Sequence, residues 1–354
     1  MISALLVNYR CHAQTLTAVA SVRADCPAAQ VVVVDNSEDP AEAGALRAAL
    51  TPDVVLLVNE VNSGFGRACN QAYAHAAHDR ILLLNPDAWV LPGCLVTLNA
   101  ELDAHPRAGA VSPLSYWDAE LSWRLPPNLQ PLGAWDLALA WAERSPWWRA
   151  RVERRYEAWL DRCHHDRRGT RQAMLSGGHM LLRRQAIESS GGLFDPAFFM
   201  YFEDADLCLR LRRAGWQLRL QPRAAVVHRW LNAGAKWALF QPSAELYRAK
   251  HPPGWAWRRL LAAAQRQSPG GEPASRSLGV LHQAPAFDLP DDWPESWRAT
   301  LAQHVSGVPA ACHDGHGRRF ELPTAIDQCL GPGRYRLCLR AGRRRLRFVW
   351  DKPG

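Results

Sequence analysis

The sequence lacks the long apolar runs and the paired cysteines that mark membrane-spanning and metal-bound proteins. No apolar run approaches the ~20 residues that a helix needs to cross a bilayer, so we expect no spanning helix. The nine cysteines include no CxxC pair and no His/Cys spacing typical of zinc sites, so we expect reduced thiols in a cytoplasmic protein. Met1 leads directly into an apolar run without a basic leader, and we therefore expect no signal peptide.

Two common nucleotide-binding motifs are also missing. No GxGxxG follows the first apolar run, which argues against a dinucleotide-binding site, and no GxxxxGKS/T motif occurs in the chain. The net charge of +8 is compatible with an anionic membrane surface, phosphorylated small molecules or nucleic acid as a partner. Because the chain carries no recognised nucleic-acid-binding motif, no nucleic-acid partner is predicted.

The length and composition are typical of a folded protein with more than one domain. At 354 residues the chain exceeds the usual size of one compact core, and its 48% hydrophobic and 21% charged residues are ordinary for a globular protein. We expect one domain over residues 1–267, with a variable helical insertion at 115–172, and a second over residues 274–354. The Pro- and Gly-containing segment 268–273 is predicted to link them.

Apolar runs and helix-like segments alternate through the first hundred residues. The runs predicted to be strands are 2–7, 31–34, 54–58 and 81–84. The segments with helical periodicity between them are 13–24, 41–50 and 67–77. This β-α-β-α-β-α-β order predicts an α/β fold with a doubly wound, mostly parallel sheet, in which ligands bind beyond the carboxyl ends of the strands.

Polar residues follow each of the four predicted strands. They are Asn8, Asp35, Asn62 and Asp87, and we expect them to converge at one edge of the sheet. Each one alone fits an ordinary turn, because Asn and Asp are common turn residues. Asp87 follows Pro86 just after a strand, which suits a Mg²⁺ or Mn²⁺ ion that takes its remaining ligands from water and diphosphate oxygens. The alternative is an ordinary Pro-Asp turn.

A cluster of carboxylates follows the aromatic run 198–202. Glu203, Asp204 and Asp206 stand directly before an amphipathic, helix-like segment. Aromatic neighbours exclude water and crowded acids repel one another, and both effects raise a carboxyl pKa towards the value that a general base needs. Alternatively, the acids only open a helix, where the helix dipole favours negative charge.

Two basic, tryptophan-bearing segments are candidates for contact with a membrane surface. Residues 115–172 are rich in Trp and Arg, and 137–142 and 152–163 within them are predicted helices. A basic helix with interfacial tryptophans can lie on an anionic bilayer; alternatively, the tryptophans fill a small core of the insertion while the arginines face water. Residues 255–261 form another predicted basic, aromatic helix and are the better candidate for membrane contact.

Residues 274–354 have the pattern of a β-rich basic module of unknown role. Apolar residues alternate with arginines over 334–340 and again over 345–350, on either side of a turn at Ala341-Gly342. This alternation predicts a hairpin with one apolar and one basic face. The basic face is either solvated or binds an anionic acceptor, a lipid headgroup or a partner.

A set of short motifs occurs in a specific order along the chain. They are Val7-Asn8-Tyr9, Val33-Val34-Asp35-Asn36-Ser37, Asn62-Ser63-Gly64-Phe65-Gly66 with Asn70, Leu84-Asn85-Pro86-Asp87, Ser176-Gly177-Gly178, Gly192-Leu193-Phe194-Asp195, Phe198-Phe199-Met200-Tyr201, Glu203-Asp204 with Asp206-Leu207, and His228. Through these motifs, the chain over residues 1–252 resembles the family 2 glycosyltransferases, in particular their bacterial rhamnosyltransferase-like branch.

The resemblance implies a GT-A fold, a nucleotide-sugar donor, a divalent metal and inversion at the anomeric carbon. It places the nucleotide-sugar site at Asn8, Tyr9, Asp35, Asn62, Gly64, Asn85 and Asp87. It assigns Mg²⁺ or Mn²⁺ to Asp87 and His228, and the catalytic base to Asp204 with Glu203 beside it. The loop after His228 is bulkier and more basic than is usual in the family, and Arg229 or Lys236 in it could contact phosphate.

These implied roles agree with the chemistry of sugar transfer, which needs one base and positive charge on the departing diphosphate. We therefore expect a metal-dependent inverting glycosyltransferase that moves rhamnose from dTDP-rhamnose, or a sugar from a UDP-sugar, to a glycan or lipid-linked acceptor in bacterial surface polysaccharide synthesis. It is expected in the cytoplasm, with peripheral contact at the anionic inner face of the cytoplasmic membrane. The alternative is a non-catalytic nucleotide-sugar or glycan binding protein on a GT-A scaffold.

Overall fold

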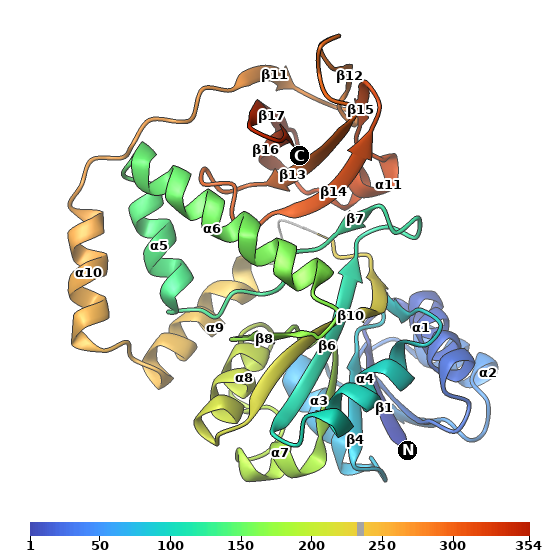
Figure 1. Ribbon diagram of the computed structural model, residues 1–354. Helices are drawn as coiled ribbons and strands as arrows, with labels where there is room; N and C mark the ends of the chain where they lie inside the picture. The colour runs from blue at the N-terminus through green and yellow to red at the C-terminus, as the bar shows by residue number, and fades with distance from the viewer. Residues whose placement is uncertain (232–236) are drawn as a thin grey trace. The chain divides into compact units, whose positions relative to one another are not determined.

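The computed structural model describes residues 1–231 and 237–354, which form two compact units (Figure 1). The N-terminal unit contains residues 1–115, 162–228 and 237–251. The C-terminal unit contains residues 116–161, 229–231 and 252–354, so the expected insertion packs with the C-terminal stretch. The expected domain boundary between 267 and 274 stays a prediction. None of the described helices is long and apolar enough to span a bilayer.

The N-terminal unit is built on a mixed sheet with the strand order β6-β9-β4-β1-β2-β3. Its four parallel strands are β1 (Ile2–Asn8), β2 (Gln30–Asp35), β3 (Val55–Val58) and β4 (Arg80–Leu84). The antiparallel strands β9 (His179–Arg183) and β6 (Ala108–Tyr116) extend the sheet beside β4. A long strand, β10 (Gln217–His228), pairs with β6 and with the short strands β5 (Ala88–Val90) and β8 (Thr170–Gln172). All four strands expected in the first hundred residues are confirmed.

Helices lie against both faces of this sheet (Figure 1). The helices of the N-terminal unit are α1 (His12–Asp25), α2 (Pro40–Ala49), α3 (Phe65–Ala74), α4 (Cys94–Ala104), α7 (Arg184–Ser189), α8 (Glu203–Arg213) and α9 (Trp237–Lys250). Ala4 and Leu6 of β1 share a core with α1 and α4, whereas α3 packs on β1 and β2. Coverage on both faces explains why 31–34 is an unbroken run of valine with no exposed side chain. The sheet and its helices confirm the expected α/β fold class.

The C-terminal unit has a sheet with the strand order β11-β17-β16-β13-β14-β7 and a separate pair, β12 with β15. Its strands are β7 (Trp123–Arg124), β11 (Arg276–Val280), β12 (Ala286–Asp288), β13 (Ser296–Ala302), β14 (Ala311–His316), β15 (Arg319–Glu321), β16 (Gly333–Ala341) and β17 (Arg344–Lys352). Its helices are α5 (Ala134–Ala142), α6 (Pro146–His165), α10 (Trp255–Gln265) and α11 (Thr324–Cys329). The helices expected at 137–142, 152–163 and 255–261 are thus confirmed as parts of α5, α6 and α10.

The predicted basic hairpin is confirmed as β16 and β17, which pair antiparallel from Gly333 with Lys352 to Ala341 with Arg344. Its apolar side chains Tyr335, Leu337 and Leu339 are buried, as the alternation requires. The basic face does not stand open to an anionic ligand, because α6 presents carboxylates to it.

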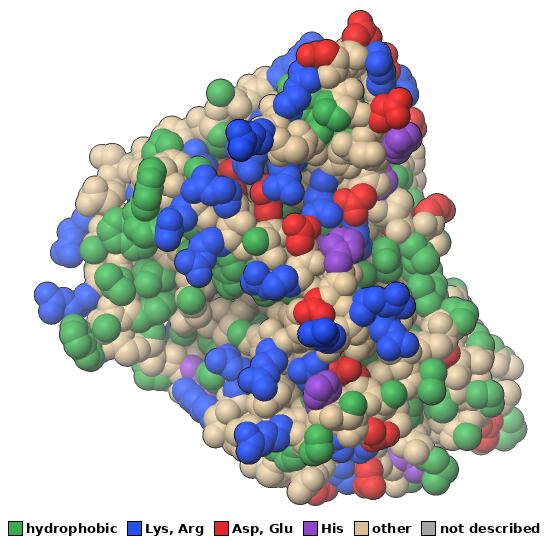
Figure 2. Space-filling model, viewed as in Figure 1, with side chains coloured by type: hydrophobic (Ala, Val, Ile, Leu, Met, Phe, Trp, Pro, Cys, Tyr) green, Lys and Arg blue, Asp and Glu red, His purple; other side chains and the backbone are tan. Residues whose placement is uncertain are grey.

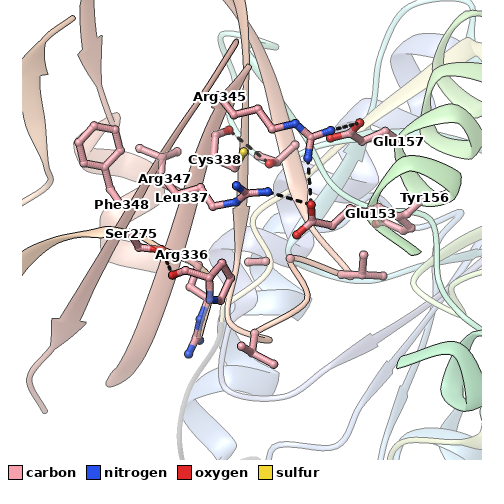
Figure 3. Close-up of a pocket in the computed structure, with 16 residues that line it drawn as sticks. Glu153, Tyr156, Glu157, Ser275, Arg336, Leu337, Cys338, Arg345, Arg347 and Phe348 are labelled. Carbon is pink, nitrogen blue, oxygen red and sulfur yellow. Dashed lines mark hydrogen bonds and ion pairs between the residues drawn. The ribbon is translucent and has the colours of Figure 1, made fainter. Parts of the chain in front are cut away.

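Two glutamates of α6 neutralise the basic face of the hairpin (Figure 3). Glu153 lies 2.9 Å from both Arg345 and Arg347, and Glu157 lies 2.6 Å from Arg340 and 3.2 Å from Arg345. Glu153, Glu157, Arg345 and Arg347 border a cavity of about 50 Å³, which has room for water but not for a sugar. The ion-pair cluster therefore joins helix to hairpin within the unit.

We predict that Glu153→Gln lowers the free energy of unfolding by about 2 kcal/mol, because it removes charge-assisted hydrogen bonds to two arginines that are mostly shielded from water. Glu321→Gln is the matched control, since Glu321 and Arg319 form a well-exposed pair at 3.9 Å whose loss costs less than about 0.5 kcal/mol. Thermal and urea unfolding measure both changes. Equal effects of the two substitutions would contradict the structural role of the cluster.

Candidate active site

The carboxyl ends of β1 and β2 meet in a buried hydrogen-bond network centred on Asn8. Its Nδ2 donates to Asp35 Oδ1 at 2.9 Å, Ser37 Oγ at 3.0 Å and Glu42 Oε2 at 3.0 Å. Its Oδ1 accepts from Thr15 Oγ1 at 2.7 Å. Asn8 and Asp35 are both buried. The network fixes the carboxylate of Asp35 at the end of β2, and Asn8 acts in it as a positioning residue.

Tyr9 differs from Asn8 because it faces solvent. Its side chain is 47% exposed, and the guanidinium of Arg10 lies 5.5 Å from the ring centroid. Arg10 has a φ of 54°, a left-handed conformation that non-glycine residues seldom adopt. An exposed, cation-flanked ring beside a buried carboxylate is suited to stack on a planar base.

The loop before α3 holds the aromatic run 198–202 in place. Asn62 Oδ1 accepts from the amide of Gly64 at 2.9 Å, and the amide of Phe65 donates to Phe199 O at 2.8 Å. Gly64 has a φ of 83°, and a Cβ on it would lie 2.5 Å from Phe199 O. Only glycine therefore permits this approach. Asn70 adds two hydrogen bonds to the backbone of Phe194, at 2.8 and 2.9 Å.

Asp87 and His228 lie together where β5 pairs with the end of β10. His228 pairs with Ala88 in the register, which brings its Nε2 to 3.3 Å from Asp87 Oδ1. His179 packs edge-on against His228, with ring centroids 5.4 Å apart. Burial, with a smaller effect from His228, lowers the pKa of His179 to about 3, so His179 is neutral at physiological pH.

The residues around Asp87 fit a divalent metal ion. His228 Nε2 and Asn85 Oδ1 are buried and make no hydrogen bond, and His228 Nε2 lies 3.3 Å from the carboxylate of Asp87. Carboxylate and amide oxygens are ordinary ligands of Mg²⁺ and Mn²⁺, and a histidine nitrogen suits a transition metal such as Mn²⁺ better than Mg²⁺. Within 1–231 and 237–354, no three His, Cys, Asp or Glu side chains are grouped as a complete metal cage. An ion here would need further ligands from water or a diphosphate.

The carboxylates Glu203 and Asp204 open α8 after two strained residues. Tyr201 and Phe202 have φ values of 70° and 67°, and such left-handed conformations at non-glycine residues concentrate at functional sites. Asp204 is half-buried and accepts from the amides of Gly177 at 3.1 Å and Ala205 at 2.8 Å. Glu203 is buried, and its Oε2 has no hydrogen-bond partner.

Burial sets the protonation of this carboxylate pair. Burial, followed by the charge of Asp204, raises the pKa of Glu203 to about 8. Burial also raises the pKa of Asp204, while the amide of Gly177 opposes the shift. Both shifts favour the protonated form of the carboxyl groups, with burial as the main cause in each. The direction of both shifts is the one expected from the sequence.

Two consecutive glycines bring the carboxylates and the candidate metal ligands side by side. A Cβ on Gly177 would lie 3.1 Å from Asp204 Cβ. A Cβ on Gly178 would lie 2.7 Å from Asn85 Nδ2 and 3.3 Å from His228 Cε1. The amide of Asn85 also donates to Gly178 O at 2.8 Å. One short backbone segment thus separates Asp204 from the site that fits a metal.

The third carboxylate, Asp206, has a different setting. It is fully buried and lies 2.7 Å from Arg210 Nε, 2.8 Å from Lys250 Nζ and 2.8 Å from His251 Nε2. Lys250 also reaches Asp195 at 2.5 Å. Burial alone would raise the pKa of Asp206, but the hydrogen bonds from Lys250, Arg210 and His251 outweigh it and lower the pKa.

The network of Asp206 ties the start of α8 to the end of α9, and the sequence did not reveal it. Asp206 was expected only to open a helix, and neither Lys250 nor His251 belongs to a recognisable motif. Of the two residues expected to contact phosphate, Arg229 is exposed directly after His228, and Lys236 lies outside the described residues.

We predict that Asp206→Asn lowers the free energy of unfolding by about 3–5 kcal/mol, because it leaves buried cationic partners without their carboxylate. The folded-state pKa of Asp206 lies below its unfolded value, so its contribution is present above about pH 4 and is lost as pH falls through the folded pKa. Urea unfolding of both proteins from neutral to acidic pH measures the difference.

The matched control is Asp195→Asn, which removes another partner of Lys250 from a more exposed position. Asp206→Asn could lower the free energy of unfolding no more than Asp195→Asn does, which would show that Asp206 is not the centre of the network. A difference in stability between wild type and Asp206→Asn that persists at the lowest pH would show the same.

Comparison with known proteins identifies the family. Residues 2–242 match the model of the family described as "Glycosyltransferase like family 2". The chain is 29% identical over 282 residues to an N-acetylglucosaminyl-diphospho-decaprenol L-rhamnosyltransferase of Mycobacterium tuberculosis, covering 73% of this chain and 86% of the relative.

One solved structure with some similarity is mannosyltransferase PcManGT from Pyrobaculum calidifontis in complex with GDP-Man and Mn²⁺. Its TM-score is 0.46 and its sequence identity is 16%, and the match covers 74% of this chain and 73% of that chain. GalNAc-T7 with UDP, GalNAc and Mn²⁺ gives a TM-score of 0.47 and 16% identity, and covers 76% of this chain and 55% of that one. Because the family model spans more than half of the sequence, the chain belongs to glycosyltransferase family 2 and is a glycosyltransferase.

Proposed function

We propose that this glycosyltransferase moves rhamnose from dTDP-rhamnose to a lipid-linked glycan acceptor, with a divalent metal and with inversion at the anomeric carbon. The name of the mycobacterial relative, which specifies a rhamnosyl group and a diphospho-decaprenol acceptor, supports the donor sugar and the kind of acceptor. The proposed setting is bacterial surface polysaccharide synthesis in the cytoplasm, at the inner face of the membrane.

The observation that carries this proposal is the double glycine at 177 and 178. The two glycines allow a base to lie on one side of a single backbone segment and a metal site to lie on the other. A direct displacement requires this arrangement. In such a displacement the acceptor hydroxyl attacks the anomeric carbon from the face opposite the departing diphosphate, so the base and the metal act on opposite sides of the sugar. A binding protein without catalysis would have no need of this geometry.

Asp204 is the proposed base. It takes the proton from the acceptor hydroxyl as that oxygen attacks, and its raised pKa favours this transfer near neutral pH. The pKa of Glu203 is also raised by burial and by the charge of Asp204, which disfavours a second negative charge beside the base. The strained pair Tyr201 and Phe202 orients the start of α8, while Asp206 ties the first turn of this helix to α9.

The donor side is formed by the strand-end residues. Asp87 and His228 would hold Mg²⁺ or Mn²⁺, which when bound supplies positive charge to the diphosphate leaving group. Asp35 would accept hydrogen bonds from the base or ribose, and Tyr9 would stack on the base. Asn85 would lie beside the diphosphate, and the Asn62–Gly64 turn would shape the donor site through its hold on Phe199.

We predict that Asp204→Asn lowers transfer from dTDP-rhamnose by about 10²–10⁴-fold, because the reaction loses its general base. Glu203→Gln should retain more activity, since glutamine resembles the protonated carboxyl that the raised pKa of Glu203 favours. Transfer to a polyprenyl-diphosphate-linked N-acetylglucosamine, measured with Mg²⁺ and with Mn²⁺, provides the comparison. In the wild type, activity should fall with decreasing pH at a value above the ordinary aspartate pKa of about 3.9.

Binding measurements separate catalysis from donor recognition. Asp204→Asn should keep the thermal stabilisation given by dTDP-rhamnose and metal, whereas Asp87→Ala should lose the part that depends on metal. Transfer that survives both Asp204→Asn and Asp87→Ala would overturn the catalytic assignment. Stabilisation by UDP-sugars but not by dTDP-rhamnose would overturn the proposed donor.

A further inference from the structure

Two exposed clusters of tryptophan and arginine lie on the C-terminal unit. At the start of α6, Trp147 is 62% exposed and Trp148 is 39% exposed, and the guanidinium of Arg151 lies 5.7 Å from the Trp147 ring. At the start of α10, Trp255 is 68% exposed, and the guanidinium of Arg259 lies 5.8 Å from its ring. Apolar side chains that are gathered in an exposed patch, rather than scattered singly, mark an interaction surface.

The helix α10 has an inner and an outer face. Ala264 is buried, and Trp257 Nε1 donates to Gly133 O, just before α5, at 3.4 Å. The outer face carries Trp255, Arg258 and Arg259, which are all exposed. Residues 252–271 contain three arginines and no Asp or Glu, so this face has positive charge without a local carboxylate to offset it.

Both clusters lie on the C-terminal unit, and a buried arginine links α6 to the segment that follows α10. Arg149 of α6 is buried, and its guanidinium donates to Gly271 O at 2.8 Å and to Gly270 O at 3.4 Å, just beyond the end of α10. Arg149 therefore departs from the alternative in which the arginines of the insertion face water. Figure 2 shows hydrophobic and basic side chains together over the region where Figure 1 places α5 and α10. We call the exposed set Trp147, Trp148, Arg151, Trp255, Arg258 and Arg259 the tryptophan–arginine surface.

Neighbouring acids do not neutralise this surface. Glu153 and Glu157 are engaged by the arginines of the hairpin, and Glu143 lies 2.8 Å from His304. Among the described residues, no carboxylate pairs with Arg151, Arg258 or Arg259. The arginines of the hairpin and those of the tryptophan–arginine surface thus differ in charge balance, although the sequence around both is basic.

We propose that the tryptophan–arginine surface binds the surface of an anionic lipid bilayer. Tryptophan rings favour the boundary between headgroups and acyl chains, while unpaired arginines are attracted to anionic headgroups. A short helix and a few exposed rings give reversible contact without spanning. The purpose of this contact rests on the proposed function, which includes a lipid-linked acceptor. The contact would keep the enzyme at the membrane that carries the acceptor.

Vesicle binding by the full chain tests this proposal. The protein is mixed with vesicles of phosphatidylcholine alone and with vesicles of phosphatidylcholine and phosphatidylglycerol, and the bound fraction is measured by flotation. We expect binding to the anionic vesicles only, weakened by added salt. The double substitution Arg258→Gln/Arg259→Gln should lower the partition coefficient by about 25-fold, since each basic side chain near the surface contributes about fivefold.

Matched variants separate charge, tryptophan and folding effects. Arg318→Gln/Arg319→Gln makes the same charge change at exposed arginines elsewhere on the unit and should leave vesicle binding within about twofold of the wild type. Trp255→Ser should weaken binding, and unchanged thermal unfolding would show that the variant is folded. Trp255 is exposed in the wild-type protein, so the substitution removes no core packing.

Several outcomes would overturn the proposal. They are equal binding to neutral vesicles, an equal loss in the control pair, tighter binding to single-stranded RNA than to vesicles, and self-association abolished by Trp255→Ser without vesicle binding. Failure here is distinct from failure of the proposed function. Transfer in detergent without vesicle binding refutes only the surface, whereas vesicle binding without transfer from any nucleotide sugar refutes only the function.

Discussion

The absence of side chains at Gly177 and Gly178 sets how closely the parts of the active site approach one another. A side chain at the first position would press on Asp204, and one at the second would overlap Asn85 and crowd His228. The segment also accepts and donates hydrogen bonds on both sides, to Asn85 and to Asp204. A larger residue at either glycine would move the proposed base away from the proposed metal ligands, so both roles depend on this one segment of backbone.

Charged networks hold each part of the molecule around that segment. Asp206 ties α8 to α9 through buried ion pairs, which secures the helix whose first turn carries Asp204. In the C-terminal unit, Glu153 and Glu157 pair with the hairpin arginines, whereas no carboxylate among the described residues pairs with Arg258 or Arg259 of α10. The two basic regions of the unit therefore differ in charge balance.

The sequence was most informative where local patterns decide the structure. Unbroken apolar runs predicted β1 to β4, and polar residues such as Asp35 marked their carboxyl ends, because both signals lie within a few residues. The network of Asp206 was not predictable, because its partners Lys250 and His251 are distant in the chain and follow no motif. The neutralised face of the hairpin was missed for the same reason: helix and hairpin each showed their own charge pattern, but not that the two pair.

The most direct test asks whether Asp87 and His228 hold the metal across the Gly177–Gly178 segment from Asp204. It is a crystal structure of the complex with Mn²⁺ and the donor nucleoside diphosphate, with anomalous scattering measured at the manganese edge. We predict one anomalous peak within coordinating distance of Asp87 and His228, with diphosphate oxygens completing the ligands and Asp204 on the other side of the Gly177–Gly178 segment. A manganese peak held by other residues, or a diphosphate bound away from Asp87, would contradict it.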